Sequence, residues 1–422
     1  MAEIWTQVAD GFSFPTSLAC APNGTLYLAE AGLPFGGAAP GGVIWQIAPD
    51  GTRTRLLDGL RPPVNGLTYH EGNLYISEGG HPGRISRLNP ATGEVTVILD
   101  NLPGPGNYHT NMVMFGPDGW MYFGQGAMTN LGIVGLDAYE LGWLRRLPHQ
   151  HDLPGYPITL TGVNATTANP LVDDPNAQIA TGSFQPFGTQ ATVGQRIPAS
   201  LPATSAILRC RPDGSNLELV AWGVRNAFAL GFLPDGRLIA IDQGADDRGS
   251  RPIGEAPDLI FEIQPNKWYG WPDFIGGVPV TDPRFAPTRG PAPTFLLANH
   301  DELPPPEQAL LRFPPHVAAV KFAIAPPDFG QYGGQLFVAL FGDEAPMTAP
   351  ADHPRMGRSL ARVDPTDWSL HPVATGPLRR PIDVQVVAGQ QALYILDFGD
   401  FEMTERGVSA KAQSGGVWRF DL

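Results

Sequence analysis

Residues 109–126 read HTNMVMFGPDGWMYFGQG, and this stretch decides the fold. It consists of a short apolar run, a Pro-Asp-Gly turn at 117–119, and a second apolar run that ends in a polar residue and a glycine. An Asp-Gly pair between two hydrophobic runs is among the strongest local signals for a β-hairpin. The stretch therefore predicts two antiparallel strands joined by a tight turn.

The same hairpin pattern occurs six times along the chain. The six copies cover residues 15–32, 63–80, 109–126, 225–244, 320–342 and 380–399, and the first two align position for position without a gap. A second hairpin pattern follows at 42–60, 83–102, 205–224 and 358–376, with a shorter version at 258–264. Each pair of patterns gives four antiparallel strands, and such a unit repeated radially is a β-propeller. The sequence predicts an all-β fold, a single six-bladed propeller domain over residues 1–422.

The sixth copy is not followed by a second pattern. Residues 415–420, GGVWRF, supply half of it, and residues 5–8, WTQV, supply the other half from the opposite end of the chain. Pairing the two terminal strands removes an exposed sheet edge, which would otherwise invite aggregation. We therefore expect the ring to close between the N- and C-terminal strands.

Charge and hydropathy exclude several partners. The formal net charge of −14 argues against nucleic acid, whose phosphates need a basic surface, and against anionic membrane surfaces. No run approaches 18 apolar residues, and the first residues show no basic segment followed by an apolar one. We expect a soluble monomer or homodimer that acts on a small molecule. Because the sequence shows no signal peptide, we expect a cytoplasmic protein, or a periplasmic or secreted one if a signal peptide has been removed.

Two long insertions interrupt the repeat, at residues 127–204 and 246–315. Loops of this length in a compact domain usually carry function. Both leave the sheet after the second strand of a hairpin, so they should lie on one face of the disc. There they would form walls and a lid over one mouth of the central channel, or simply pack between blades.

Aligning the copies places polar side chains around the axis, because the first strand of each blade lines the centre of a propeller. Asn111, Arg225 and Asn226 should lie one turn nearer the mouth. Converging polar groups in a funnel are the usual sign of a binding site, and a water-filled structural channel is the alternative. The aligned column comprises Ser17, Asn65, Met112, Ala229, Lys321 and Asp383.

A second set of aligned residues stands at the end of the second strand in each copy. Most of its carboxylates should accept backbone N–H groups of the following loop. The turn after Asp242 is also a candidate calcium site, because Ca²⁺ prefers carboxylate and backbone carbonyl oxygens. The column comprises Glu30, Glu78, Gln125, Asp242, Leu340 and Asp397, and the calcium turn comprises Gln243, Gly244, Ala245, Asp246 and Asp247.

Three segments carry a resemblance to a known family. WGVRNAFALGFLPDGRL at 222–238, the acidic loop at 243–258 followed by YGWP at 269–272, and RPIDV at 380–384 resemble motifs of the soluble quinoprotein glucose/sorbosone dehydrogenases. The resemblance covers most of the chain outside residues 127–204. It implies a six-bladed propeller that holds pyrroloquinoline quinone (PQQ) and Ca²⁺ over the axis and abstracts hydride from a sugar, with a histidine as general base.

The resemblance implies a role for each matching residue. Arg225 and Asn226 would contact the quinone, Lys321 and Arg380 would pair its carboxylates, and Gly244 and Ala245 would offer carbonyls to calcium. Tyr108 stands at the position of the family histidine and Val64 at that of a glutamine. His109, one residue later, can act only if the local backbone bulges, because a shift by one turns a strand side chain to the other face.

The resulting expectation is a sugar dehydrogenase. The expected catalytic residues are His109 and Asn111, the expected cofactor-binding residues are Arg225, Asn226, Lys321, Arg380 and Asn65, and the expected metal ligands are Gln243, Gly244, Ala245, Asp246, Asp247 and Asp383.

Two other classes remain open. In a calcium-dependent hydrolase of the lactonase or phosphotriesterase type, an axial metal would polarise the ester and activate water. Asn65, Asn111, Asn226 and Asp383 would suit such a metal as oxygen ligands. The third possibility is a propeller that only binds a partner.

Overall fold

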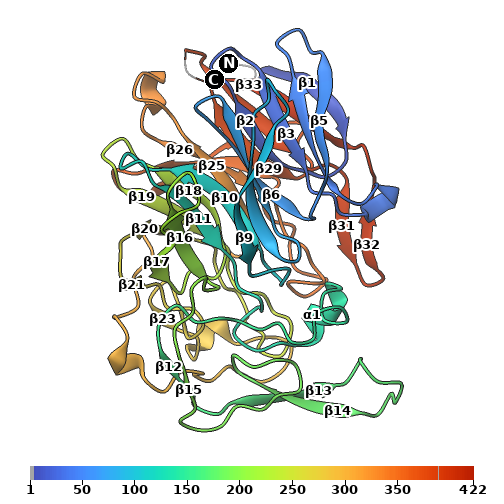
Figure 1. Ribbon diagram of the computed structural model, residues 1–422, viewed down its shortest axis with the longest axis vertical. Helices are drawn as coiled ribbons and strands as arrows, with labels where there is room; N and C mark the ends of the chain where they lie inside the picture. Colours follow the sequence, from blue (N-terminus) through green and yellow to red (C-terminus); the bar gives the residue numbers. More distant parts are fainter. Residues whose placement is uncertain (1–3, 388) are drawn as a thin grey trace.

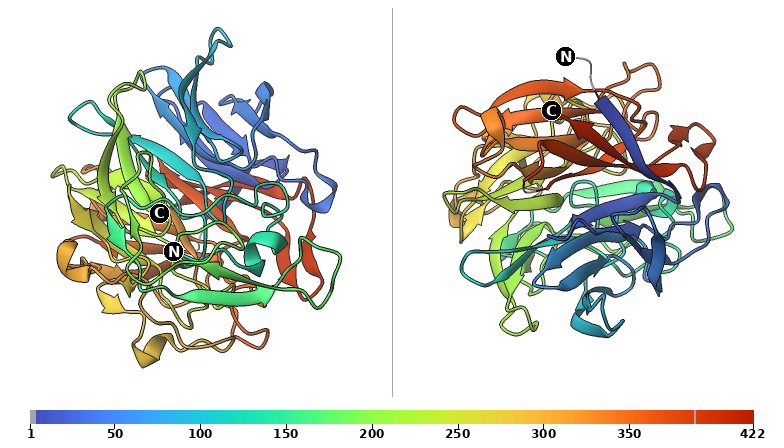
Figure 2. Two further views of the ribbon diagram at one scale, coloured as in Figure 1. Left: turned by 60° about the horizontal axis from the view of Figure 1, so that its bottom comes forward. Right: turned by 90° about the horizontal axis from the view of Figure 1, so that it is seen from above.

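The computed structural model describes residues 4–387 and 389–422, and the chain forms a six-bladed β-propeller. Seen from above, the colours of the sequence follow one another around a ring (Figure 2, right). The first three blades are β2 (Pro15–Cys20), β3 (Leu26–Glu30), β4 (Gly42–Ile47) and β5 (Arg53–Leu60); β6 (Val64–His70), β7 (Asn73–Glu78), β8 (Gly83–Leu88) and β9 (Val95–Leu102); and β10 (Thr110–Phe115), β11 (Met121–Gln125), β16 (Ala206–Cys210) and β17 (Glu218–Trp222).

The other three blades repeat this order. They are β18 (Ala227–Phe232), β19 (Leu238–Asp242), β20 (Leu259–Ile263) and β24 (Leu311–Arg312); β25 (Ala319–Ile324), β26 (Leu336–Leu340), β27 (Ser359–Asp364) and β28 (Ser369–Ala374); and β29 (Pro381–Val386), β30 (Ala392–Asp397), β33 (Gly415–Asp421) and β1 (Ile4–Phe12).

The ring closes as the sequence predicted. β1 pairs antiparallel with β33, from Ile4 opposite Asp421 to Phe12 opposite Gly415. The two strands lie side by side at the top of Figure 1, dark blue beside red. The sixth sheet thus combines both ends of the chain in the order β1-β33-β30-β29.

The hydrophobic core lies between the blades. The second strands β11, β19 and β26 are buried at every position, because each is covered by neighbouring blades on both faces. The outer strands β5 and β9 are largely exposed.

Two outer strands differ from the repeat. The fourth strand of the fourth blade is β24, which pairs with β20 at Leu259 and Ile260. Both strands lie within residues 246–315, so the range predicted as the second insertion contains two strands of the fourth blade. The third blade carries a fifth strand, β21 (Lys267–Trp268), which is parallel to β17.

A β-bulge recurs in all six inner hairpins, next to the residue that pairs with the end of the second strand. A bulge re-aims side chains locally. It places Thr16, Asn65 and Asn111 at one level and Ser17, Gly66 and Met112 at the next.

The predicted axial column was therefore wrong at Asn65, since Gly66 occupies the position in the second blade that corresponds to Ser17 in the first. The cause is the turn: Cys20 and Leu26 enclose five residues, whereas His70 and Asn73 enclose only Glu71 and Gly72. Both turn residues have positive φ, 47° and 79°. This is the type I′ geometry of a two-residue hairpin, which changes the pairing by one residue.

Apart from the blade strands β20 and β24, both insertions lie on the same side of the disc, in the lower half of Figure 1. They contact each other where Leu160 bridges Leu297 and where the Asn299 side chain accepts the N–H of Thr159. The described residues contain no helix long and apolar enough to cross a membrane. The short elements of the insertions are α1 (Leu136–Glu140), β12 (Ile158–Thr159), β13 (Asn164–Ala168), β14 (Gln178–Gly182), β15 (Arg196–Ile197), β22 (Phe274–Ile275), β23 (Val278–Pro279), η2 (Pro283–Phe285) and η3 (His300–Glu302); elsewhere lie η1 (Phe35–Gly37), η4 (Gly330–Tyr332), β31 (Phe401–Thr404) and β32 (Gly407–Ala410).

Candidate functional site

A crater of about 960 Å³ opens on the face that carries the insertions. Loops of five blades surround it: the first blade contributes Phe35, the third and fourth contribute their insertions, and the fifth and sixth contribute 341–347 and 398–408. A smaller cavity of about 200 Å³ adjoins it. Four residues line both spaces: Leu141, Arg248, Glu344 and Met347.

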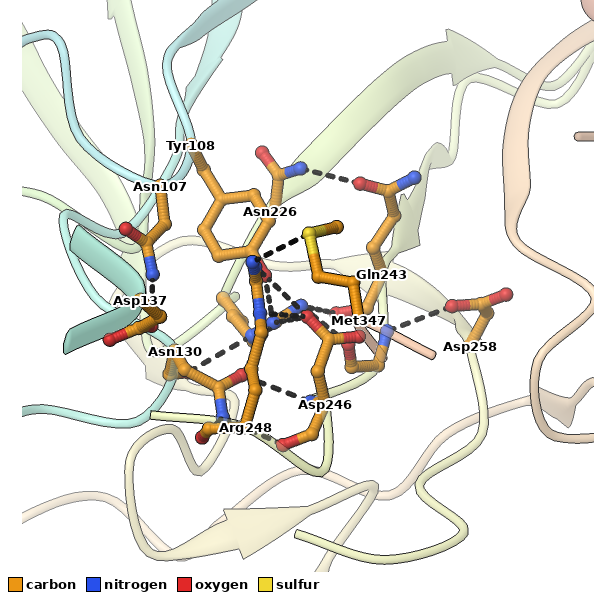
Figure 3. A network of polar contacts seen from close by, with 12 residues as sticks. Asn107, Tyr108, Asn130, Asp137, Asn226, Gln243, Asp246, Arg248, Asp258 and Met347 are labelled. Carbon is orange, nitrogen blue, oxygen red and sulfur yellow. Dashed lines mark hydrogen bonds and ion pairs between the residues drawn. The ribbon is translucent and has the colours of Figure 1, made fainter. Parts of the chain in front are cut away.

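The smaller cavity is built around a buried cluster of opposite charges, in which Tyr108, Asp246 and Arg248 converge (Figure 3). Arg225 pairs with Asp246 at 2.9 Å, donates to the Tyr108 hydroxyl, and stacks on the Tyr108 ring at 4.2 Å. Asn130 accepts from Arg225 at 2.7 Å. Burial alone would raise the pKa of Asp246, but the guanidinium groups of Arg248 and Arg225 lower it. Asp246 is therefore an ionised carboxylate held by two arginines.

Arg225 also binds the oxygens that the sequence assigned to calcium. Its guanidinium donates to the carbonyl of Gln243 at 3.0 Å and to that of Gly244. Asp246 is ion-paired, and Asp247 accepts the N–H groups of Thr288 and Arg289. Calcium needs six to eight free oxygens. This turn therefore does not fit a calcium ion, because an arginine side chain supplies the positive charge; Ala245 lines the cavity beside it.

Lys321 occupies the axis. It is 1% exposed and donates from Nζ to the backbone carbonyls of Thr16 (2.7 Å) and Asn65 (2.9 Å) and to the Ser17 hydroxyl. The Asp383 carboxylate lies 3.8 Å away. Burial lowers the pKa of Lys321 to about 8, although Asp383 opposes the shift. An ammonium ion thus stands where the hydrolase interpretation required an axial metal.

Arg380 is as deeply buried as Lys321. It donates to the carbonyls of Gly342 (3.0 Å) and Asp343 (2.7 Å) and pairs with Glu402 at 3.0 Å. Neither Lys321 nor Arg380 lines the crater or the smaller cavity. Lys321 and Arg380 are thus bound within the protein, away from the crater. The arginines that line the crater are Arg248, which pairs with Asp246, and Arg289, which donates to the carbonyls of Pro346 and Ala349.

Tyr108 and His109 point in different directions. The Tyr108 ring enters the smaller cavity, whereas His109 is absent from the lining of either space. The His109 Nδ1 atom is buried without a hydrogen-bond partner, and burial lowers the pKa of the ring to about 4. The bulge that would bring His109 toward the mouth begins only after Thr110.

Three amides form a chain below the cavity. Asn111 donates to Asn226 at 2.7 Å, and Asn226 donates to Gln243 at 2.7 Å. The Asn111 Oδ1 atom is buried without a partner. The contact between Asn111 and Asn226 agrees with the level predicted for both, whereas Gln243 was expected in the calcium turn and instead accepts from Asn226.

The carboxylates of the second column bind backbone, chiefly at the entry to the first strand of their own blade. Asp242 accepts the N–H groups of Arg225 and Asn226. Asp397 accepts those of Arg379 and Arg380. The sequence predicted that these carboxylates would bind the loop after the second strand. That contact is a minor one, and an example is the N–H of Gly399, which donates to Asp397. Burial raises the pKa of Asp242 to about 7.

Sequence reasoning missed Glu344, which lines both the crater and the smaller cavity. Burial raises its pKa, with Arg380 and Arg248 acting in the opposite direction. The signal was present in the repeat. Residues 340–344 of the fifth blade, LFGDE, correspond to residues 242–246 of the fourth, DQGAD. Glu344 is therefore the counterpart of Asp246.

Comparison with known proteins supports the fold. No family model matches the chain, and no curated protein matches it. Among solved structures, the PQQ-bound aldose sugar dehydrogenase of Streptomyces coelicolor aligns over 99% of this chain and 98% of its own, with a TM-score of 0.57 and 17% identity. The holo PQQ domain of pyranose dehydrogenase from Coprinopsis cinerea aligns over 100% and 96%, with a TM-score of 0.58 and 13% identity. This chain thus has the same fold as these propeller dehydrogenases.

Proposed function

We propose that this protein is a propeller oxidoreductase that binds a quinone of the PQQ type in the crater and oxidises a sugar-like alcohol there. The crater's position supports the proposal, because loops of five blades and both insertions converge on it. Its volume lies within the usual range for ligand sites, about 300–1,000 Å³. The motifs at 222–238, 269–272 and 380–384 point the same way.

The lining of the crater suits a planar anion. Phe341, Phe398 and Phe401 offer aromatic surface, and Arg248 and Arg289 offer positive charge to carboxylates. When bound, the quinone would supply the two-electron acceptor. Calcium has no part in this proposal, since Arg225 binds the carbonyls that a calcium ion would need.

Glu344 is the proposed general base. It lines the space where the crater meets the smaller cavity, and its raised pKa brings it closer to neutral pH, where a base is most effective. The insertions would exclude water above it. His109 is less suited to this role, because it lines neither space.

The first test is binding. Purified protein is dialysed against PQQ without added calcium, and bound quinone is measured by its absorbance. We expect one equivalent, with at least about tenfold weaker binding in Arg289→Met, since a hydrogen bond to a charged group is worth about 1.5–3 kcal/mol and about 1.4 kcal/mol corresponds to a tenfold change in affinity. Arg284→Met is the matched control, because Arg284 is an exposed arginine of the same insertion, paired with Asp282. Absence of quinone binding would rule out the proposal.

The second test is turnover. Loaded protein should reduce an artificial dye with aldose sugars, and Glu344→Gln should lower kcat by about 10²–10⁴-fold. Activity of the parent should rise with pH as Glu344 loses its proton, at a pH above the usual range for glutamate, and this limb should be absent from the variant. Cleavage of lactones without quinone or dye reduction would instead favour the hydrolase class.

A further inference from the structure

A cluster of two histidines and one glutamate lies beside the smaller cavity, outside the machinery described above. Glu255 belongs to the second insertion, His316 follows that insertion directly, and His353 comes from the loop between β26 and β27. Their ligand atoms all lie within 4.8 Å of one another. From this arrangement we propose that the protein binds a divalent transition-metal ion of the zinc class through Glu255, His316 and His353.

The distances match a shared metal. The Nε2 atoms of His316 and His353 lie 3.2 and 3.7 Å from the same Glu255 oxygen, Oε1. Zinc–nitrogen and zinc–oxygen bonds of 2.0–2.2 Å in a tetrahedral site separate neighbouring ligand atoms by about 3.3 Å. The centroids of the two imidazole rings lie 4.1 Å apart, and the rings are tilted by 62°, so they do not stack. Both Nε2 atoms lie near the Glu255 carboxylate.

A second contact fixes the tautomer of His353. Its Nδ1 atom lies 2.9 Å from the carbonyl oxygen of Pro354, which can only accept, so Nδ1 carries the proton. The Nε2 lone pair is then directed at Glu255. Histidines that bind metals usually donate their other N–H in this way. A cation bound between this nitrogen and Glu255 Oε1 would accept the lone pair.

The backbone is held in an unusual conformation at two of the three positions. Glu255 and His316 have positive φ values of 52° and 65°. Non-glycine residues in this region cost free energy and are concentrated at functional sites. His316 and His353 are only 10% and 19% exposed, whereas Glu255 is 55% exposed. The cluster is thus accessible to an incoming ion from one side.

The donor set selects the class of metal. Two imidazoles and one carboxylate suit Zn²⁺, Co²⁺, Ni²⁺ and Cu²⁺, while Ca²⁺ and Mg²⁺ prefer oxygen ligands. Three protein ligands leave a coordination position open, the pattern of zinc sites that bind water or substrate. Because His316 also lines the smaller cavity, this position is close to the site described above. The inference does not depend on quinone binding or sugar oxidation.

The test is a titration of metal-free protein with Co²⁺, followed by the visible absorption of the bound ion, and with Zn²⁺ by calorimetry. We expect one equivalent, not displaced by excess Ca²⁺ or Mg²⁺, and at least about tenfold weaker binding in Glu255→Gln and in His353→Asn. His371→Asn is the control, because His371 lies on strand β28 beside Ser369 and should bind metal like the parent. Thermal melts without metal check that each variant is folded.

Three outcomes would overturn the proposal. In one, no ion binds, and NMR titration shows a proton shared between His353 and Glu255. In another, an equivalent binds with equal affinity in Glu255→Gln, so a different site is responsible. In the third, Ca²⁺ displaces Co²⁺, which would show that oxygen ligands dominate.

Discussion

Arg225 is the residue on which the site most depends. It joins Tyr108, Asp246 and two carbonyls of the turn that follows β19. Breaking a buried ion pair by removing one partner costs about 3–5 kcal/mol. Without Arg225, the Asp246 carboxylate keeps only Arg248, and the carbonyls of Gln243 and Gly244 lose their donor. Arg225→Met should lower the free energy of unfolding by about this amount in urea denaturation.

A matched control distinguishes burial from charge. Arg237 pairs with Asp235 at 2.8 Å, and these side chains are 37% and 53% exposed. Exposed pairs contribute about 0–1 kcal/mol. Arg237→Met should therefore leave the free energy of unfolding nearly unchanged. A similar loss of stability in both variants would contradict the view that the buried contacts of Arg225 stabilise the site.

The same contacts predict how the protein responds to calcium. A ligand that binds only the native state raises the melting temperature as its concentration increases. Because guanidinium nitrogens already bind the carbonyls of Gln243 and Gly244, adding Ca²⁺ to metal-free protein should leave the melting temperature unchanged. A rise of several degrees, together with calcium in elemental analysis, would show that the ion displaces the Arg225 guanidinium from these carbonyls.

At the scale of elements, β33 closes the ring by pairing with β30 and β1. Deleting residues 417–422 would remove most of this strand and expose two sheet edges, which act as templates for association. The shortened protein should be insoluble or unfolded. Deleting Leu422 alone is the control, since it lies beyond β33. A soluble truncated protein with an unchanged melting temperature would contradict the closure.

The strands could be predicted from the sequence because each hairpin repeats the same alternation and turn. What could not be predicted is the pairing inside a hairpin: the two-residue turn at Glu71 and Gly72 leaves the copy length unchanged but moves Asn65 by one position. The partners of the buried side chains could not be predicted either. Lys321 was correctly placed on the axis, but its partners Thr16 and Ser17 lie more than 300 residues away.

The site itself was only partly predictable, because its ligands come from insertions that do not follow the repeat. Arg225 and Asp246 were both selected from motifs, yet no motif indicated that they bind each other. Glu255, His316 and His353 are isolated in sequence, and only the folded loops bring them together.

For the whole molecule, buried carboxylates make stability depend on pH. Burial raises the pKa of Asp242 to about 7 and that of Asp258 to about 6, against about 3.9 for aspartate in an unfolded chain. Between pH 4 and 7 the native state holds protons that the unfolded state has released. Their contribution to stability is therefore present at low pH and is lost as pH rises through this window. His109 acts in the opposite direction, since burial lowers its pKa to about 4.

A comparison with Asp258→Asn separates these effects, because His109 titrates in both proteins. The stability of the parent relative to the variant should fall between pH 5 and pH 7.5 in urea denaturation. Asp235→Asn is the control, because Asp235 lies in an exposed turn and its pKa is lowered by the N–H of Arg237, so its effect is confined to lower pH. A pH-independent difference for Asp258→Asn would contradict the prediction.

The pairing of β1 with β33 also has a consequence for synthesis on the ribosome. Ile4 pairs with Asp421, so β1 leaves the ribosome long before its partner strand β33. At about 5–20 residues per second, translation separates the two by roughly 20–80 s. Throughout that interval the nascent chain carries a strand without its partner, and the yield of native protein should therefore respond to translation speed and to chaperones that shield unpaired strands.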